Sequence, residues 1–99
     1  MTYRFNEFYI PTRMMGGIQR YVEHGIVPGD FLCAVIQNDL KEAVRKADEE
    51  NMRNLPAYVS YFYIEAPSEC WGSPKHMSQW IKFHQDKRKC QEESDAAHK

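Results

Sequence analysis

The 99-residue sequence lacks several features that would assign it to a common class of protein. It has only three cysteines, Cys33, Cys70 and Cys90, without a CxxC spacing, and this odd count favours a reducing compartment over a disulfide framework. No apolar run approaches the roughly 18 residues that a membrane-spanning helix needs. The first residues also lack the basic start and long apolar stretch of a signal peptide. We therefore expect a soluble cytoplasmic protein without a membrane partner.

The sequence also lacks the common motifs of catalytic, phosphate-binding and metal-binding sites. The sequence contains no Walker-type phosphate loop, no GxSxG and no HExxH, and its cysteines and histidines follow no zinc-binding spacing. We expect no enzyme, no catalytic residue, no metal and no cofactor. The formal net charge of −1 argues against a broad electrostatic grip on duplex nucleic acid, so nucleic acid is not an expected partner. The balanced charge does not exclude a small local site for an anion.

The residues that are present predict one compact helical domain. Hydrophobic residues make up 42% of the chain and aromatic residues 13%, which is enough for a single core. We predict a mainly α fold, a compact bundle of about four helices. An aromatic N-terminal arm (1–11) precedes the helical domain (12–85), and a charged tail (86–99) that we expect to be flexible follows it. Because so small a domain buries a modest fraction of its surface, we also expect a homo-oligomer.

Two helices are predicted in the first half of the chain. Apolar residues recur at helical spacing over 12–24, and Gly25 suits the left-handed stop that often ends a helix. A second helix is predicted over 31–50, with Asp30 as its N-cap and a long apolar stripe that includes Leu40.

The second half is predicted to be helical too. The segment 57–66 is aromatic and β-branched, which suits either a strand or a short buried helix. We favour the helix because no second long strand is available to pair with it. Gly72 is predicted to form a turn and Ser73 to cap a last helix that begins at Pro74, where a missing N–H has no consequence.

Two adjacent glycines stand inside the first predicted helix. Gly16 and Gly17 each cost roughly 1 kcal/mol relative to alanine in a helix interior, so the pair needs a reason. Arg13, Gly17, Arg20 and His24 project into one narrow sector of this helix. Guanidinium groups around a bare patch of backbone suit phosphate or carboxylate oxygens. The alternative is that the arginines are solvated and the glycines allow close packing against another helix.

Asp39 stands at the edge of the second apolar stripe, where an unpaired carboxylate would be costly to bury. A salt bridge to Arg13, Arg20 or Lys46 is the structural interpretation. The functional interpretation is that Asn38 and Asp39 bind polar groups of a ligand.

Trp71 stands in a turn beside Ser73. A tryptophan next to hydroxyl groups is a candidate platform for stacking a base, and it is equally suited to covering the core. Tyr21 is a second candidate for stacking.

Several segments resemble a known group of proteins. "RMMGG", "RYVEHG", "PGDF", "NDLKEA" and "CWGSP", all within residues 10–82, resemble a family of small proteins from tailed bacteriophages and prophages. This resemblance brings no reaction and no cofactor. It implies action in the cytoplasm of a bacterial host, where small accessory phage proteins often counter defence systems by binding a defence protein or a signalling nucleotide.

Three functional hypotheses follow. The first is capture, without turnover, of a small phosphorylated and possibly cyclic nucleotide by the residues named above. The alternative is a protein–protein inhibitor of a defence complex of the CRISPR or restriction kind, with the aromatic arm and "NLPAYVSYFY" as its contact residues. A third is a nucleic-acid accessory factor that uses "KFHQDKRK".

Overall fold

The computed structural model describes residues 3–97, with side chains up to residue 89. Its elements are, in chain order, strands β1 (Arg4–Phe5) and β2 (Phe8–Tyr9), helices α1 (Thr12–His24), α2 (Asp30–Ile36), α3 (Leu40–Lys46), α4 (Glu49–Arg53) and α5 (Leu55–Ser60), the π-helix η1 (Tyr61–Glu65), the 3-10 turn η2 (Ser68–Cys70) and helix α6 (Pro74–Ala97). The predicted mainly helical fold is confirmed. In the described part of the chain no helix is both long and apolar enough to span a membrane.

The N-terminal segment forms a small antiparallel hairpin that packs on its own chain. Phe5 pairs with Phe8 across the hairpin, and Asn6 turns it with a φ of 54°. The backbone N–H of Tyr9 donates to Asn54 at 2.9 Å, and the Tyr3 and Ser60 hydroxyls are 2.9 Å apart. The hairpin is therefore held against the start and the end of α5.

Helix α1 matches its predicted bounds. It follows Pro11, and Gly25 ends it in the left-handed conformation with a φ of 66°. A Cβ at Gly25 would lie 2.7 Å from the Cβ of His84, so both the backbone angle and the close passage of α6 require glycine here.

The single helix predicted over 31–50 is wrong, because the segment folds as α2, α3 and α4. Asn38 adopts a left-handed φ of 60°, and the side chains of Asp39 and Asp48 accept hydrogen bonds from the first turns of α3 and α4. Short polar side chains that satisfy free N–H groups start new helices in an otherwise helical pattern. The predicted N-cap Asp30 is the first residue of α2, after Gly29.

The later elements follow the predicted signals more closely. The helical interpretation of 57–66 is confirmed by α5 and η1. Gly72 turns with a φ of 109°, Ser73 accepts the N–H of His76 at 3.1 Å, and α6 begins at Pro74 as predicted. The sequence places the end of this helix near residue 85, whereas α6 continues to Ala97. Neither glycine nor proline interrupts the chain beyond Pro74.

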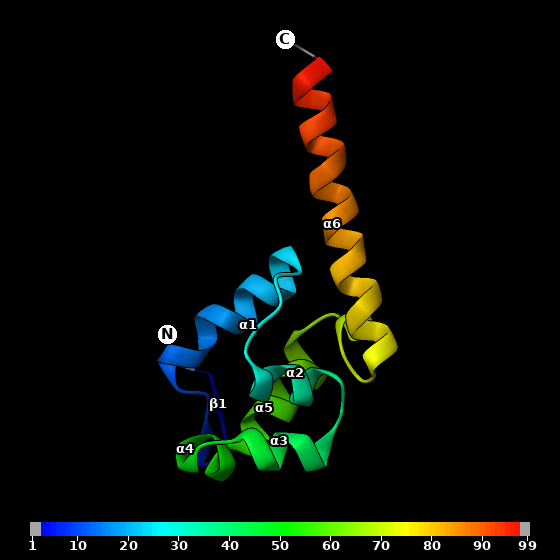
Figure 1. Ribbon diagram of the computed structural model, residues 1–99. Helices are drawn as coiled ribbons and strands as arrows, with labels where there is room; N and C mark the ends of the chain where they lie inside the picture. The colour runs from blue at the N-terminus through cyan, green and yellow to red at the C-terminus, as the bar shows by residue number, and fades with distance from the viewer. Residues whose placement is uncertain (1–2, 98–99) are drawn as a thin grey trace.

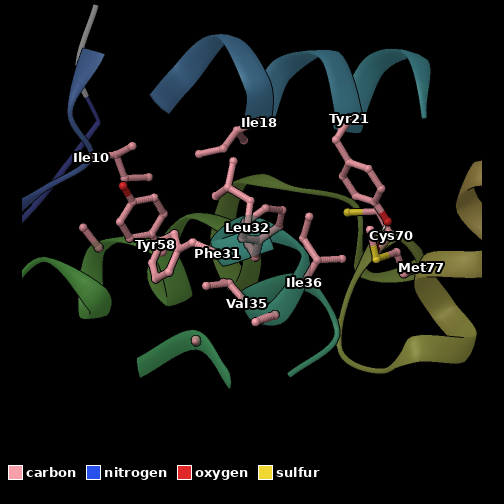
Figure 2. Close-up of a cluster of buried hydrophobic side chains, with 14 of the residues drawn as sticks. Ile10, Ile18, Tyr21, Phe31, Leu32, Val35, Ile36, Tyr58, Cys70 and Met77 are labelled. Carbon is pink, nitrogen blue, oxygen red and sulfur yellow. Dashed lines mark hydrogen bonds between the residues drawn. The ribbon is translucent and has the colours of Figure 1, made fainter. Parts of the chain in front are cut away.

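The core lies between α1, α2, α5 and the start of α6 (Figures 1 and 2). Its fully buried large side chains are Tyr21, Tyr58, Phe62, Ile10, Ile18, Ile36 and Cys70. Figure 2 shows Tyr21 reaching from α1 toward Cys70 and Met77, while Leu32 and Ile36 fill the space below α1. Leu40, predicted to lie on a buried stripe, is 65% exposed. The broken helix leaves that part of the stripe at the surface.

Candidate functional site

The glycine pair of α1 does not form an open notch. A Cβ on Gly17 would meet Leu32 of α2 at 3.5 Å, an ordinary van der Waals distance. A Cβ on Gly16 would meet the guanidinium of Arg20 at 3.1 Å. Gly17 therefore faces Leu32 of another helix with room for a methyl group, so this contact does not require glycine as the packing alternative expected, and Gly16 lies under the side chain of Arg20.

The two arginines beside the glycines differ in their partners. Arg13 donates to Asp48 at 2.9 Å and to Glu50 at 3.1 Å, and both carboxylates raise the pKa of its guanidinium. Arg20 is exposed and forms no ion pair with any side chain that the structure describes. Arg13 thus joins α1 to α4, and Arg20 keeps a free guanidinium.

Tyr21 is not available for the predicted ligand contact, whereas His24 is exposed. Tyr21 is fully buried and donates its hydroxyl to the carbonyl oxygen of Cys70 at 2.5 Å. Burial raises the pKa of Tyr21, and its ring has no exposed face on which a base could stack. His24 is exposed on the last turn of α1, 3.9 Å from the carboxylate of Glu23.

Three of the predicted site residues come together at a small hollow away from α1. Asn38, Asp39 and Trp71 line a hollow of about 30 Å³ between α2, α3 and α5. This hollow has room for water but not for a nucleobase. No predicted residue of α1 lines it.

Asp39, Trp71 and Ser73 each make a contact that stabilises the fold. Asp39 caps α3 and pairs with none of the three cations proposed for it. Trp71 is half-buried, with its ring centroid 5.9 Å from that of Phe62, which agrees with the interpretation of Trp71 as core cover. Ser73 caps α6, and its hydroxyl lies 2.8 Å from the Nδ1 atom of His76.

A continuous apolar surface lies on another side of α5. An open groove of about 440 Å³ runs along α5 and η1 and is closed by Phe5 of the hairpin. Leu55 and Val59 line this groove and also the small hollow beside Leu40, so the two are continuous. We call the following set the apolar surface: Phe5, Leu40, Leu55, Pro56, Val59, Tyr63 and Ile64.

Two strongly exposed members of the apolar surface lie on a rare backbone conformation. Tyr63 is 78% exposed and Ile64 61% exposed, both within the π-helix η1. π-Helical turns are uncommon and occur often at functional sites. The aromatic arm and "NLPAYVSYFY" already indicated this region, but the contribution of Leu40 depends on a helix break that the apolar pattern concealed.

The described part of the chain offers no obvious centre for chemistry. No group of three or more histidine, cysteine or carboxylate residues within it is arranged to hold a metal ion. Burial raises the pKa of Cys70 to about 11 and also raises that of Cys33, so both thiols are poorly ionised at neutral pH.

Comparisons with protein-family models, with curated proteins and with solved structures give no match to this chain.

Proposed function

We propose that this protein is a non-catalytic binding protein that captures a partner protein through the apolar surface. The setting implied by the phage resemblance is the cytoplasm of a bacterial host, and the proposed partner is a component of a defence complex. The inhibitor hypothesis, rather than nucleotide capture, is the one that the geometry supports best.

The exposure of large apolar side chains on η1 carries this proposal. Tyr63 and Ile64 stand largely in solvent, and Val59, one turn away on α5, is 44% exposed. Contiguous apolar surface of this kind on a small protein typically marks an interaction site. Tyrosine is also enriched among the residues that dominate binding energy.

The chemistry of the groove specifies the kind of partner. None of its lining residues is charged; the Ser60 hydroxyl is already hydrogen-bonded to Tyr3, and the hydroxyl of Tyr63 is the other polar group of the lining side chains. The hairpin strands are only two residues long, too short for a partner strand to form a ladder of hydrogen bonds. The best fit is the apolar face of an amphipathic helix laid into the groove.

Paired substitutions test the proposal. Immobilised wild-type protein is expected to retain a specific protein from a bacterial lysate, and calorimetry with that purified partner gives the affinity. Val59→Asp together with Ile64→Asp would place two carboxylates in the groove, and we expect at least a tenfold loss of affinity. Ile26→Asp is the matched control, because Ile26 is also exposed but lies outside the apolar surface.

Two outcomes would overturn this function. If the double variant and the control retain the partner equally, the apolar surface is not the binding site. If sedimentation shows that wild-type protein is a dimer and the double variant a monomer, the surface joins two copies of this chain. That second outcome would instead support the predicted homo-oligomer.

Nucleotide capture is kept as a second candidate because of Arg20. Its guanidinium is exposed, has no carboxylate partner among the described side chains and covers Gly16. A phosphate could draw this flexible side chain away from the backbone and bind both. Asn38, Asp39 and Trp71 lie at a separate hollow, so any such site would be small.

A further inference from the structure

The charge of this protein is unevenly distributed along the chain. Residues 1–73 carry ten carboxylates and seven Lys or Arg residues, whereas residues 74–89 of α6 carry five Lys or Arg residues and one Asp. The total of −1 therefore conceals a basic segment. We call residues 74–89 the basic segment of α6.

Within the part of the chain whose side chains are described, the cations of the basic segment have no carboxylate partner. Arg13, Arg45 and Lys46 of the body form ion pairs, but among the described side chains none of the five cations of the basic segment does. Arg88 donates to the backbone oxygen of His24. Figure 1 shows α6 projecting from the body, and the five cations of the basic segment are all exposed.

An ordered aromatic pair lies within the same segment. Trp80 donates its indole N–H to the backbone oxygen of Tyr21 at 3.0 Å, which fixes its ring against α1. The ring of Phe83 stacks on Trp80, with centroids 6.0 Å apart and planes 27° apart, and Phe83 is 56% exposed. The two rings, with Gln79 and Glu69, line an open hollow of about 260 Å³. Phe83 is thus an exposed aromatic residue on a rigid support.

Helix geometry places lysines around this pair. Lys75, Lys82 and Lys89 follow one another at intervals of seven residues and fall on one side of α6, with successive lysines about 10 Å apart along the axis. Lys82 directly precedes Phe83, and Lys87 lies one turn beyond it. Cations beside an exposed stacking ring are the recurring elements of proteins that bind single-stranded nucleic acid.

We infer that the basic segment of α6 binds single-stranded nucleic acid, with a base stacked on Phe83 and phosphates held by Lys82 and Lys87. Single strands are specified because their unpaired bases can reach an aromatic ring, whereas bases of a duplex are already stacked. Gln79 and Glu69 offer hydrogen-bonding groups to the edge of that base. This site is separate from the apolar surface and does not depend on the proposed capture of a protein.

The test is fluorescence anisotropy with a labelled 20-nucleotide dT strand and with its dA·dT duplex, both at about 50 mM salt. Wild-type protein is expected to bind the single strand more tightly than the duplex, and binding is expected to weaken as salt rises. Lys82→Ala with Lys87→Ala is expected to weaken binding at least tenfold. Two lost phosphate contacts also make the salt slope shallower by about 1.4.

Two further variants separate stacking and general charge effects. Phe83→Leu keeps an apolar side chain but removes the ring, and we expect at least fivefold weaker binding. Lys41→Ala with Arg53→Ala is the matched control, since it removes two exposed cations of the body, and it is expected to bind as wild type does. Far-UV circular dichroism checks that each variant keeps its helices.

Three results would each overturn the inference. In the first, the protein does not bind the single strand at 50 mM salt. In the second, the Lys82/Lys87 and Lys41/Arg53 double variants weaken binding equally. In the third, Phe83→Leu leaves the affinity unchanged. Sedimentation that shows α6 pairing with a second copy and excluding the strand would also overturn it, in favour of a protein contact.

Discussion

The hydroxyl of Tyr9 donates a hydrogen bond of 2.7 Å to Glu50, a residue 41 positions further along the chain. The other carboxylate oxygen of Glu50 accepts from Arg13 at 3.1 Å. One carboxylate of α4 thereby holds both the hairpin and the first turn of α1. This arrangement stabilises the wall of the groove to which Phe5 belongs.

The first prediction concerns acid stability. The hydrogen bond from Tyr9 and then that from Arg13 hold the pKa of Glu50 below its ordinary value, so the ionised form favours the folded state. The free energy of unfolding is therefore expected to fall as the pH drops below about 4.5 and Glu50 is protonated. Glu50→Gln removes this contribution and flattens the dependence, as urea unfolding between pH 5 and pH 3 would show.

The control for this measurement is Glu49→Gln. Glu49 is the neighbouring exposed carboxylate, and none of the ion pairs formed by described side chains includes it. Its variant is expected to follow the wild-type pH dependence. A Glu50→Gln protein that loses stability as steeply as wild type would contradict the role given to Glu50.

The second prediction concerns Gly25. Alanine at this position meets a left-handed φ of 66° and a Cβ only 2.7 Å from that of His84. The backbone angle alone costs about 1–2 kcal/mol, and the contact with α6 adds to it. We expect Gly25→Ala to lower the thermal midpoint by at least about 4 °C. An unchanged midpoint would show that α6 does not pack on Gly25 as described.

The third prediction is that a substitution at Gly17, unlike the one at Gly25, makes the protein more stable. Gly17 has ordinary helical angles, and a Cβ there lies at a comfortable 3.5 Å from Leu32. Gly17→Ala is expected to raise the free energy of unfolding by about 0.5–1 kcal/mol, because alanine has less backbone freedom to lose. Chemical denaturation measures this directly. A loss of stability would mean that the packing of α1 on α2 needs glycine.

The fourth prediction separates the two candidate functions. If a phosphate binds at Arg20, a panel of linear and cyclic nucleotides will contain one that raises the thermal midpoint of the wild type. Arg20→Ala is expected to abolish that rise while leaving the midpoint without ligand nearly unchanged, since Arg20 is exposed. Arg53→Ala serves as the control. If no nucleotide raises the midpoint, the capture of nucleotides is excluded.

Some of the fold follows from local signals in the sequence. Gly25 and the Ser73–Pro74 pair mark the end of one helix and the start of another, and the structure confirms both. The break at Asn38 could not be predicted from the apolar stripe, because that stripe continues through it. Asn38 and Asp39 together were the signal for a turn followed by a cap.

The candidate site was less predictable because its contacts join distant segments. The position of Asp48 near Arg13 depends on where α4 starts, and that start depends on the two helix breaks before it. The exposure of Leu40 has the same origin. The aromatic run "NLPAYVSYFY" needed no such information, since its composition alone indicated a contact surface.

The hairpin has a consequence for the order in which this chain folds. Tyr3 and Ser60 touch although 57 positions separate them, and Phe5 meets a groove whose other residues lie between Leu55 and Ile64. During synthesis on the ribosome, the first residues emerge long before α5 exists. Docking of the hairpin on α5 joins segments far apart in the sequence, so we expect it to be a late step of folding. Until the hairpin docks, the nascent chain lacks the Phe5 wall of the groove and cannot bind a partner there.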